Sequence, residues 1–424
     1  MRPRIGLPNP DGLAVLEAAP SRGFAMANHT TGKSWLGFNW QISLASGWGV
    51  LGLNLALEAE QDGRYQPVPL IPTADAQWLQ PDQLKWLNPV LARERIARNL
   101  LDSNPEGQCR CDFPVIHSLG NCLGQAPATE RVIGNQNLAI AFFEDTELGP
   151  DLAATAGRYS LILPGSTWNT QILRERGVTH VATFLQGVDL AAFQPAARPS
   201  DLGRPFIIYS GGKLEYRKGQ DIVVAAFKRF HQRHPNSLLV TTWHNHWPQT
   251  IPGIERAGYV QGTPVTNPDR SLDVTTWLEA NGVPRGASKN FGPVLNRVMP
   301  QLYHQADVAL FTNRCEGGTN LVAMECLACG VPTILSANTG HLDLADPAHC
   351  FPLFRQGAVA PSPKFHGTQG WGESDVEEAL ENLERVYRDR AEANRRGEAA
   401  ARFMKNWSWR VRFEELVRHM QALR

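Results

Sequence analysis

The sequence predicts an α/β protein of two domains whose parallel sheets face one another across a cleft. Short apolar runs rich in β-branched and aromatic residues alternate with helical patterns along most of the chain, as in βαβ units. The chain has 424 residues, more than the ~250–300 at which a single hydrophobic core stops growing. The apolar runs also form two series, which a stretch of prolines and polar residues separates.

The first series predicts an N-terminal Rossmann-like domain at residues 35–195, preceded by an extension at 1–34. Six apolar runs mark its strands: WLGFNWQIS (35–43), YQPVPLIP (65–72), FPVIHSL (113–119), NLAIAFFE (137–144), YSLILPGS (159–166) and VTHVATFL (178–185). The segments VLGLNLALEAEQDG and STWNTQILRERG predict helices between strands. The extension contains no apolar run long enough for the core of a signal peptide.

The second series predicts a C-terminal Rossmann-like domain at residues 205–405. Its strands are PFIIYSGG (205–212), SLLVTTW (237–243), DVALFTN (307–313) and PTILSAN (332–338), and QDIVVAAFKRFHQRHP predicts an amphipathic helix. FQPAARPSDLGRP has three prolines and no periodic pattern, which predicts a linker at 196–204. Segment 354–373 is predicted to be an irregular loop, and the helices that follow it would begin with Ser374 as N-cap.

Composition argues against several classes of function. Lys plus Arg and Asp plus Glu both total 41, so no global charge favours nucleic acid as a partner. Seven cysteines without a disulfide framework indicate reduced thiols and a cytoplasmic location. Cys109 and Cys111, like Cys326 and Cys329, lack a second ligand pair at zinc spacing, so we expect no metal site. No segment approaches the ~20 apolar residues of a membrane span, and glutamates among the terminal arginines disfavour peripheral membrane contact.

The stretch SGWGVLG, residues 46–52, matches GxGxxG letter for letter between a predicted strand and a predicted helix. The acidic residue that closes the second strand of a dinucleotide-binding fold is missing, because YQPVPLIPT ends in Pro and Thr. At Gly47 and Gly49 the backbone would still approach a ligand closely. The alternatives are a nicotinamide dinucleotide site and a plain tight turn.

The stretch SGGKLEYRKGQD, residues 210–221, runs from the end of a predicted strand into a helix. Lys213, Arg217 and Lys218 follow Gly212 within six positions, so their charges add to the dipole of the helix N-terminus. This combination predicts a site for phosphate oxygens. The alternative is a solvated basic turn.

The stretch CEGGTNLVAMECLACGVP, residues 315–332, predicts a helix that follows a strand and a loop of glycines and small polar residues. The first free amides of that helix belong to Thr319, Asn320 and Leu321, beside Gly318, and they would point into the same crevice. We expect them to bind a second face of the same diphosphate.

Three further side chains are candidates for contacts with a ligand. A buried carboxylate costs several kcal/mol or shifts its pKa unless donors satisfy it. Glu325, one turn inside the helix, would take such donors from the vicinal hydroxyls of a ribose, or else it faces solvent. Glu316, in the loop, would bind a sugar hydroxyl in the same way. His117 ends a predicted strand on the cleft side, where it either contacts substrate or is a satisfied structural residue.

Taken in order along the chain, these motifs resemble the GT-B nucleotide-sugar glycosyltransferases, and specifically the retaining family 4 type, also called group 1. SGGKLEYRKGQD is similar to that family's G-R-L-x-x-x-K-G turn, and EGGTNLVAMECLACGVP to its E-G-F-G-L-x-x-x-E-A-x-A-C-G-x-P signature. LQGVDLAAFQP, residues 185–195, matches the N-G-V-D-x-x-x-F-x-P segment that leads out of the first domain, and NWSWRVRFEELV resembles the terminal helix. The likeness covers about residues 36–424.

The resemblance implies a nucleotide-diphosphate sugar as donor and no cofactor. It implies that Lys213 and Lys218 neutralise the diphosphate, with the amides near Thr319 holding its other oxygens. Glu325 would hold the ribose hydroxyls, and Glu316 the transferred sugar. Lys213 stands where the family has arginine, so its contact would be a single charge-assisted bond.

The resemblance also assigns roles in the first domain, which the C-terminal helix at about 406–424 would join. Gly47 and Gly49 would let backbone approach the phosphate end of the donor, and His117 would contact the sugar or the acceptor hydroxyl. One departure affects the second domain: eight residues separate Glu316 from Glu325, where the family has seven. The extra residue must bulge in the loop, which puts the role of Glu316 in question.

The expected reaction is transfer to an acceptor hydroxyl with retention of configuration and without a metal ion, because cations and amides would neutralise the leaving diphosphate. Two other functions stay open: a nicotinamide-dependent oxidoreductase using GWGVLG, and a nucleotide-sugar binding protein without turnover. The sequence does not specify the nucleotide, the sugar or the acceptor, which would be a saccharide, a lipid or a small molecule. The loop TTWHNHWPQT, residues 241–250, would stack a base, line the acceptor path or form a surface cluster.

Overall fold

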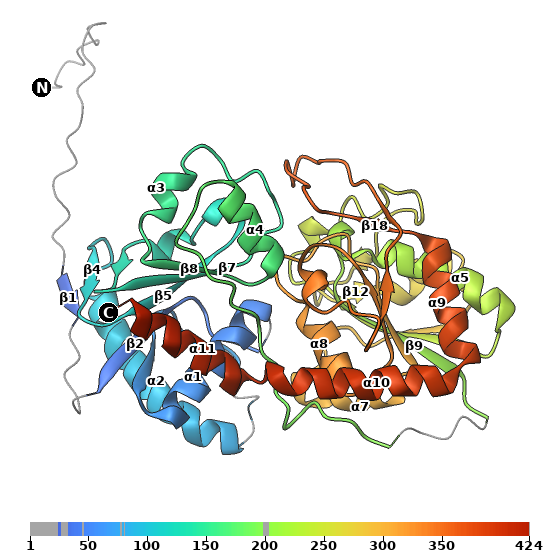
Figure 1. Cartoon of the computed structure of the whole chain (residues 1–424), viewed down its shortest axis with the longest axis horizontal. Coiled ribbons are helices and arrows are strands. Elements are labelled where there is room, and N and C mark those ends of the chain that lie inside the picture. Colours follow the sequence, from blue (N-terminus) through green and yellow to red (C-terminus); the bar gives the residue numbers. More distant parts are fainter. Residues whose placement is uncertain are drawn as a thin grey trace, which may run out of the picture.

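The computed structural model describes residues 24–26, 33–44, 46–76, 79, 81–197 and 203–423. They form two α/β domains that lie side by side, with the last helices running beneath both (Figure 1). Most of the predicted extension at 1–34, and residues 198–202 of the predicted linker, lie outside the described residues. The predicted fold class, two domains with parallel sheets, is confirmed.

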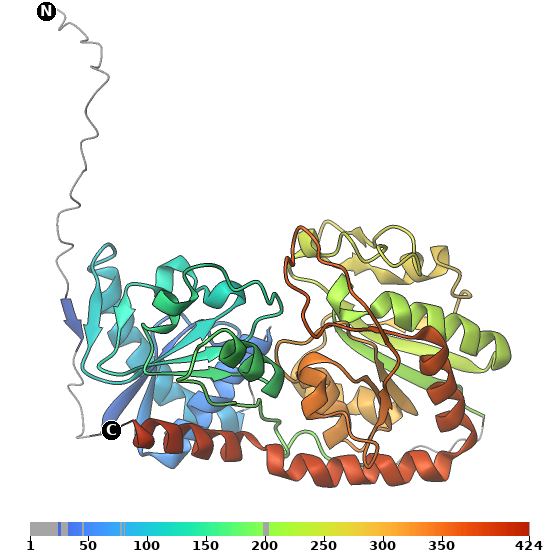
Figure 2. The ribbon, with the colours of Figure 1, turned by 45° about the horizontal axis from the view of Figure 1, so that its top comes forward.

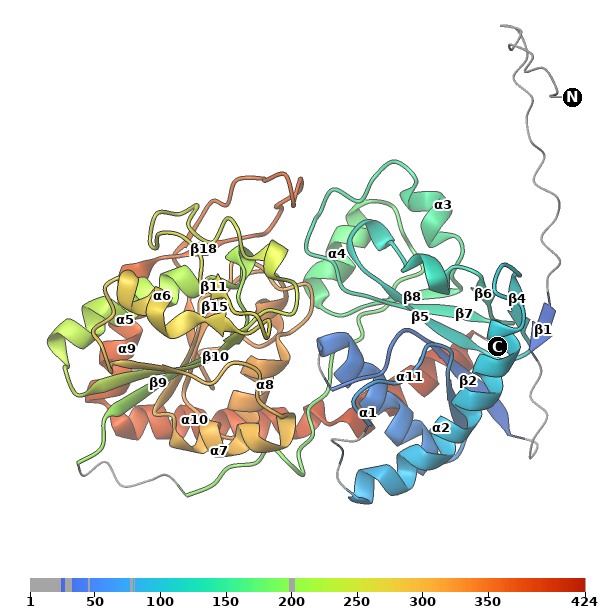
Figure 3. The same cartoon turned by 180° about the vertical axis from the view of Figure 1, so that it is seen from behind.

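The N-terminal sheet has five parallel strands in the order β3-β2-β5-β7-β8. In chain order they are β2 (Ser34–Asn39), β3 (Tyr65–Pro69), β5 (Val115–Leu119), β7 (Asn137–Ala141) and β8 (Leu161–Pro164). The helices α1 (Gly47–Asp62) and α2 (Pro81–Asp102) lie on the side away from α3 (Leu152–Ala156) and α4 (Thr167–Glu175) (Figure 3). A small parallel sheet joins β1 (Phe24–Met26), β4 (Cys109–Cys111) and β6 (Val132–Ile133).

The sixth predicted strand, 178–185, does not form. Val181 makes a single bridge to Ile162 of β8. The chain stays beside β8 as far as Phe184, since Ala182 N donates to Ile162 O at 3.1 Å and Phe184 N donates to Pro164 O at 2.8 Å. The Phe184 side chain is buried in the core that Trp409 and Phe413 of the last helix also enter.

The C-terminal sheet has six strands in the order β13-β10-β9-β14-β15-β16, all parallel. They are β9 (Phe206–Lys213), β10 (Ser237–His244), β13 (Ser288–Asn290), β14 (Val308–Phe311), β15 (Thr333–Ser336) and β16 (Phe351–Leu353). Helices α5 (Gln220–Arg233), α6 (Val274–Ala280), α7 (Met299–Gln305), α8 (Leu321–Ala328) and α9 (Val376–Arg388) surround it. The predicted loop 354–373 contains β17 (Gln356–Gly357), which pairs with β18 (Glu373–Ser374). The cap of α9 is Asp375 rather than the predicted Ser374, since the Asp375 carboxylate accepts from Glu378 N at 2.8 Å.

The chain ends with α10 (Arg390–Met404) on the C-terminal domain and α11 (Trp409–Ala422) on the N-terminal domain (Figure 2). Phe413 and Leu416 of α11 are fully buried in the same core as Leu51 of α1. Arg410 adds an ion pair to Asp62 at 2.9 Å. The last helix thus ties the two domains together.

The facing edges of the domains also hydrogen-bond directly. The Ser166 hydroxyl, which caps α4, donates to Gly317 O at 2.8 Å, and the Thr167 hydroxyl donates to Asp343 at 2.6 Å. Asp145 accepts the backbone N–H groups of His366 and Gly367 at 2.8 and 2.7 Å. These contacts hold the loops after the N-terminal strands against the C-terminal domain.

The sequence predicts that no segment spans a membrane and that the cysteines are reduced thiols. Among the described helices, none combines the length and the apolar character needed to cross a bilayer. The cysteines are free thiols, and Cys122 is the one that is exposed: Cys109, Cys111, Cys122, Cys315, Cys326, Cys329 and Cys350. The cytoplasmic location stays a prediction.

Candidate active site between the two domains

A cavity of about 530 Å³ lies between the domains, at the carboxyl ends of β9 and β10. Ligands of open α/β sheets bind at this end of the strands. Residues from both domains line the cavity, among them Gly47, Trp48, Asn121, Phe142, Glu144, Gly212, Lys213, Arg217, Lys218, His244, His246, Trp247, Asn296, Glu316, Gly318, Asn320, Leu321 and Glu325. The structure therefore brings together most of the residues that the sequence singles out.

The basic residues reach the cavity because of the turn after β9. Gly212 has a left-handed φ of 113°, and the chain then forms the 3-10 turn η4 (Tyr216–Lys218) before α5. Gly219 ends this turn at φ 69°, and a Cβ there would lie 2.0 Å from Thr312 O. Only glycine fits that position, so the turn is held tightly against the strand next to it.

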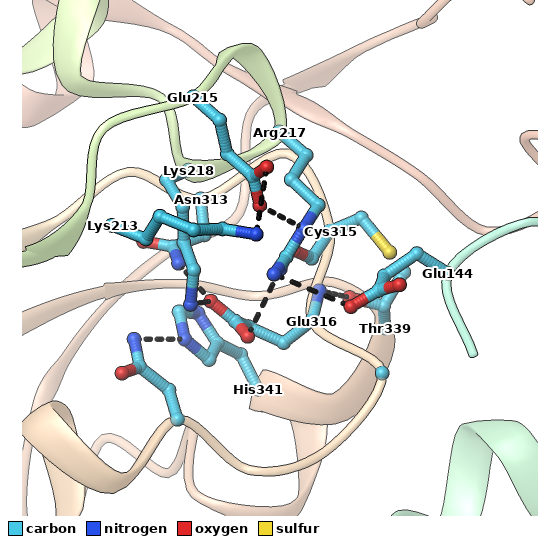
Figure 4. A network of polar contacts seen from close by, with 12 residues as sticks. Glu144, Lys213, Glu215, Arg217, Lys218, Asn313, Cys315, Glu316, Thr339 and His341 are labelled. Carbon is cyan, nitrogen blue, oxygen red and sulfur yellow. Dashed lines mark hydrogen bonds and ion pairs between the residues drawn. The ribbon is translucent and has the colours of Figure 1, made fainter. Parts of the chain in front are cut away.

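Lys218 is paired with the first of the two predicted glutamates. Its Nζ lies 2.5 Å from Glu316 Oε1, and the Asn313 amide donates to the same oxygen (Figure 4). Arg217 Nη1 approaches the other carboxylate oxygen at 3.4 Å. Burial would raise the pKa of Glu316, but the charges of Lys218 and Arg217 outweigh it and hold that pKa below its usual value. Glu316 is therefore ionised and fixed.

Lys213 is paired with Glu215, a residue that the motif analysis did not single out. Lys213 Nζ lies 3.1 Å from Glu215 Oε2, and Lys364 approaches the same oxygen at 3.3 Å. Arg217 Nε lies 2.5 Å from Glu215 Oε1. Burial opposes ionisation of Glu215, yet Arg217, Lys213 and Lys364 lower its pKa to about 2. Glu215 positions the cations of the turn from behind the cavity wall.

Arg217 is buried and links the two domains. Besides Glu215 and Glu316, its guanidinium pairs with Glu144 at 3.3 Å, and Glu144 follows β7 of the N-terminal domain (Figure 4). Sequence reasoning weighed Arg217 as a third cation and overlooked Glu144. Its position in the sequence gives a signal all the same, because it is the last residue of the predicted run NLAIAFFE, at the ligand-facing end of a strand.

Glu325 does not face solvent, because the residue is only 7% exposed. Asn296 Nδ2 donates to Oε1 at 2.9 Å and the Tyr303 hydroxyl donates to Oε2 at 2.6 Å. Burial raises the pKa of Glu325 to about 7, although these two hydrogen bonds oppose the shift. Protein donors thus satisfy part of the carboxylate, which still lies on the cavity wall.

The N-terminal turn of α8 forms the adjacent wall through Asn320 and Leu321. Asn320 caps the helix in a left-handed backbone conformation, φ 64°, and its own amide donates to His341 Nε2 at 3.0 Å. Thr319 lies behind this wall, where its hydroxyl contacts the Met324 sulfur at 3.0 Å. The whole residue is buried and does not line the cavity, so the predicted contact of Thr319 with a ligand is not supported.

His117 does not reach the cavity, contrary to expectation. It lies inside β5, where it pairs with Asn39 and Ala139 of the neighbouring strands, and it is 3% exposed. Nδ1 accepts from Asn39 and Gln125 at 3.0 and 2.9 Å, and Nε2 donates to Asn137 Oδ1 at 2.9 Å. Burial lowers the pKa of His117 to about 4. Both ring nitrogens of His117 have hydrogen-bond partners within the N-terminal domain, so we assign His117 a structural role.

The two predicted glycines, Gly47 and Gly49, lie in the first turn of α1 and differ in their surroundings. A Cβ at Gly47 would meet only Leu321 Cδ1, at 3.8 Å, so this backbone is open toward the cavity wall. A Cβ at Gly49 would lie 2.1 Å from Ser43 Oγ and 2.7 Å from Ser43 O. Gly49 is thus required for packing inside the N-terminal domain rather than for approach to a ligand.

No group of three or more His, Cys, Asp or Glu side chains in the described part of the chain is arranged to hold a metal ion. The end of β10 and the loop that follows it place His244, His246 and Trp247 on the cavity wall. Trp247 is 48% exposed, and Lys213 Nζ lies 5.5 Å from the centre of its ring. These three side chains of the predicted loop therefore line the cavity, whereas Trp243 is buried in the core of the C-terminal domain.

Comparison with known proteins finds similarity to glycosyltransferases in part of the chain. Residues 295–416 match the family model described as family 4 glycosyltransferase in conflict systems. The glycogen synthases of Mycobacterium tuberculosis strains CDC 1551 / Oshkosh and H37Rv are each 30% identical to this chain over 185 residues, or 43% of this chain and 38% of each synthase. The match thus spans about two fifths of the length of these curated relatives.

Solved structures match over nearly the whole chain. Sucrose-phosphate synthase from Thermosynechococcus elongatus has a TM-score of 0.59 at 14% identity, covering 92% of this chain and 99% of that one. Anabaena HepE in complex with UDP and glucose has a TM-score of 0.57 at 14% identity, with 92% and 99% covered. Trehalose-phosphate synthase from Burkholderia vietnamiensis has a TM-score of 0.56 at 12% identity, with 93% and 100% covered. At these identities the likeness establishes the fold.

Proposed function

We propose that the chain is a glycosyltransferase of the family 4, group 1 type with the GT-B fold, and that it moves a sugar from a nucleotide-diphosphate sugar to an acceptor hydroxyl. The proposed transfer retains the anomeric configuration and needs no metal ion. One observation carries the proposal: Lys213, Lys218 and the first turn of α8 lie on the wall of one interdomain cavity. A leaving diphosphate needs this combination of cations and backbone amides.

Lys213 and Lys218 would neutralise the leaving diphosphate, as a metal ion does in other sugar transfers. Negative charge grows on the diphosphate as the bond to the sugar breaks, and preorganised cations stabilise that charge without reorganising. Lys213 and Lys218 are held in place by Glu215 and Glu316, respectively, before any donor binds. This ordering favours a metal-independent mechanism, and the departing phosphate would guide the acceptor to the same face of the sugar.

Glu325 is proposed to bind the donor ribose. Asn296 and Tyr303 each occupy one of its oxygens, and a carboxylate accepts up to about four hydrogen bonds, which leaves acceptor capacity for two vicinal hydroxyls. We place the transferred sugar beside Glu316, and backbone at Gly47 beside the phosphate end of the donor. Solved structures of HepE contain UDP and UDP-glucose, so UDP-glucose is the first donor to test.

The acceptor would enter between Trp48 and Asn121 of the N-terminal domain and Trp247 of the C-terminal domain, which share the cavity wall. An indole that is half exposed in a cavity offers a flat apolar surface, which suits the face of a sugar ring or another flat ligand. A saccharide or another hydroxyl-bearing small molecule is therefore the acceptor class that we propose.

The deciding experiment is a thermal-shift screen with UDP, GDP, ADP, their glucose conjugates and NAD. We expect one nucleoside diphosphate and its sugar to raise the melting temperature, and NAD to have no effect. Nuclear magnetic resonance of the product then gives the anomeric configuration, and turnover in EDTA tests the metal. Stabilisation by NAD alone would favour the oxidoreductase, and stabilisation without any donor hydrolysis or transfer would favour a binding protein.

A further inference from the structure

We propose that Glu144 is an internal counter-anion that competes with the donor diphosphate for Arg217, and so sets the affinity for the donor. This inference rests on the proposed function, because it assigns a residue to the same donor site. Neither the sequence motifs nor the comparisons assign any role to Glu144.

The argument begins with the charges on the cavity wall. Among the described residues, three cations line the cavity, Lys213, Arg217 and Lys218, and three carboxylates line it as well: Glu144, Glu316 and Glu325. The positive site expected from the sequence is therefore balanced by the protein's own carboxylates. A diphosphate gains most from such a site if one of these carboxylates moves away.

Two of the three carboxylates are held by several partners. Glu316 is bound by Lys218, Arg217 and the Asn313 amide, and its side chain is 7% exposed. Glu325 accepts from Asn296 and Tyr303 and is equally buried. Moving either one would leave several buried donors without an acceptor, which is costly.

Glu144 is held differently. In the described part of the chain its carboxylate makes its ion pair with Arg217 alone, at 3.3 Å, and its side chain is 21% exposed. Its backbone is fixed, because Glu144 N donates to Asn121 Oδ1 at 2.8 Å and Glu144 O accepts from Trp371 Nε1 at 2.9 Å. The side chain can therefore rotate away while the loop stays in place.

Arg217 keeps other partners when Glu144 leaves. Its Nε stays with Glu215 and its Nη1 with Glu316 and Cys315 O, so the Nη2 group that faces Glu144 becomes available to phosphate oxygens. Guanidinium groups bind such oxygens well. The exchange also breaks an ion pair between the domains, so that donor binding and the interdomain contact are coupled.

The test measures the binding of UDP, GDP, ADP and inorganic pyrophosphate by calorimetry to the wild type and three full-length variants. Glu144→Gln removes the charge, and we expect about tenfold tighter binding of pyrophosphate and of the preferred nucleotide, as for the loss of one nearby like charge. Lys218→Ala should weaken binding at least tenfold. Thr167→Val removes a hydrogen bond to Asp343 between the domains without touching the cations, and its affinity should equal that of the wild type.

The outcomes separate the inference from the function beneath it. If Lys218→Ala weakens binding but Glu144→Gln binds no more tightly than the wild type, the counter-anion role is wrong while the donor site stands. If Thr167→Val tightens binding as much as Glu144→Gln, loosening of the domains explains the gain and the charge does not. If none of the four proteins binds any nucleotide or pyrophosphate, the proposed function fails and the inference fails with it.

Discussion

Replacing Glu325 with glutamine should make the stability of the protein less dependent on pH. Glutamine has nearly the same shape as glutamate, and it can keep both present contacts, since its oxygen accepts from Asn296 and its amide donates to the Tyr303 oxygen. What the substitution removes is a buried group that ionises. Its effect on stability therefore isolates the cost of the charge.

The size of that cost follows from the raised pKa. Burial moves the pKa of Glu325 from its ordinary value of 4.5 to about 7, which corresponds to about 3 kcal/mol. Between these two pH values the folded chain binds the proton more tightly than the unfolded chain, so the free energy of unfolding falls as the pH rises. The stabilisation is complete below about pH 4.5 and lost above about pH 7.

Urea unfolding followed by tryptophan fluorescence at pH 5, 6, 7 and 8 measures the difference. We expect Glu325→Gln to match the wild type within about 1 kcal/mol at pH 5 and to exceed it by about 2–3 kcal/mol at pH 8. The control is Glu398→Gln, because that side chain is 70% exposed on α10. A difference between Glu325→Gln and the wild type that stays constant from pH 5 to pH 8 would refute the reasoning.

Three further substitutions test other parts of the structure. Lys218→Ala should lower the transfer rate by about 100- to 1,000-fold, as for a lost oxyanion donor, and should also lower the melting temperature, because it removes one cation from the buried Glu316 carboxylate; an unaltered rate would exclude the phosphate role. Arg314→Met should cost about 3–5 kcal/mol in unfolding free energy, because Arg314 and Asp221 form an ion pair in which both side chains are fully buried. Gly49→Ala should cost about 1–3 kcal/mol in unfolding free energy through its overlap with Ser43, with donor affinity retained in the folded fraction.

Each of these variants has a matched control. Lys405→Ala removes an exposed lysine remote from the cavity lining, and its transfer rate should equal that of the wild type. Arg314→Met combined with Asp221→Leu removes both charges and should recover part of the lost stability. Gly47→Ala should leave stability unchanged and weaken donor binding, because its Cβ has room but stands on the cavity side.

The strands that the sequence predicts well are those buried on both faces. Runs such as FPVIHSL and DVALFTN are continuous and apolar because helices cover both sides of the sheets. The edge strands β13 and β16 were missed, since three residues are too few to show a pattern. The sixth run forms only a single bridge to β8, and its Phe184 packs in a core with a helix more than 200 residues later in the chain, a contact that no local pattern reveals.

The candidate site also contains residues that local sequence patterns place and residues that depend on distant partners. Motifs that begin helices, such as those around Lys218 and Asn320, could be placed from the sequence because strand, turn and helix N-terminus are local features. His117 could not be placed, since its partners Asn39 and Asn137 come from two other strands. The same holds for Glu144, whose partner Arg217 belongs to the other domain. What the sequence lacks in each case is the identity of the distant partner.

The two glutamates of the stretch CEGGTNLVAMECLACGVP show how much those distant partners decide. Glu316 and Glu325 are both nearly fully buried, and they belong to one loop and the helix that follows it. Cations from the turn after β9 surround Glu316 and lower its pKa, whereas neutral donors from Asn296 and Tyr303 surround Glu325 and leave its pKa raised. Glu316 therefore stays charged over the whole physiological range, but Glu325 changes its charge near pH 7. Because vicinal hydroxyls stabilise a carboxylate in its charged form, ligand binding at Glu325 would lower its pKa and release a proton, which ties donor affinity to pH through this one residue.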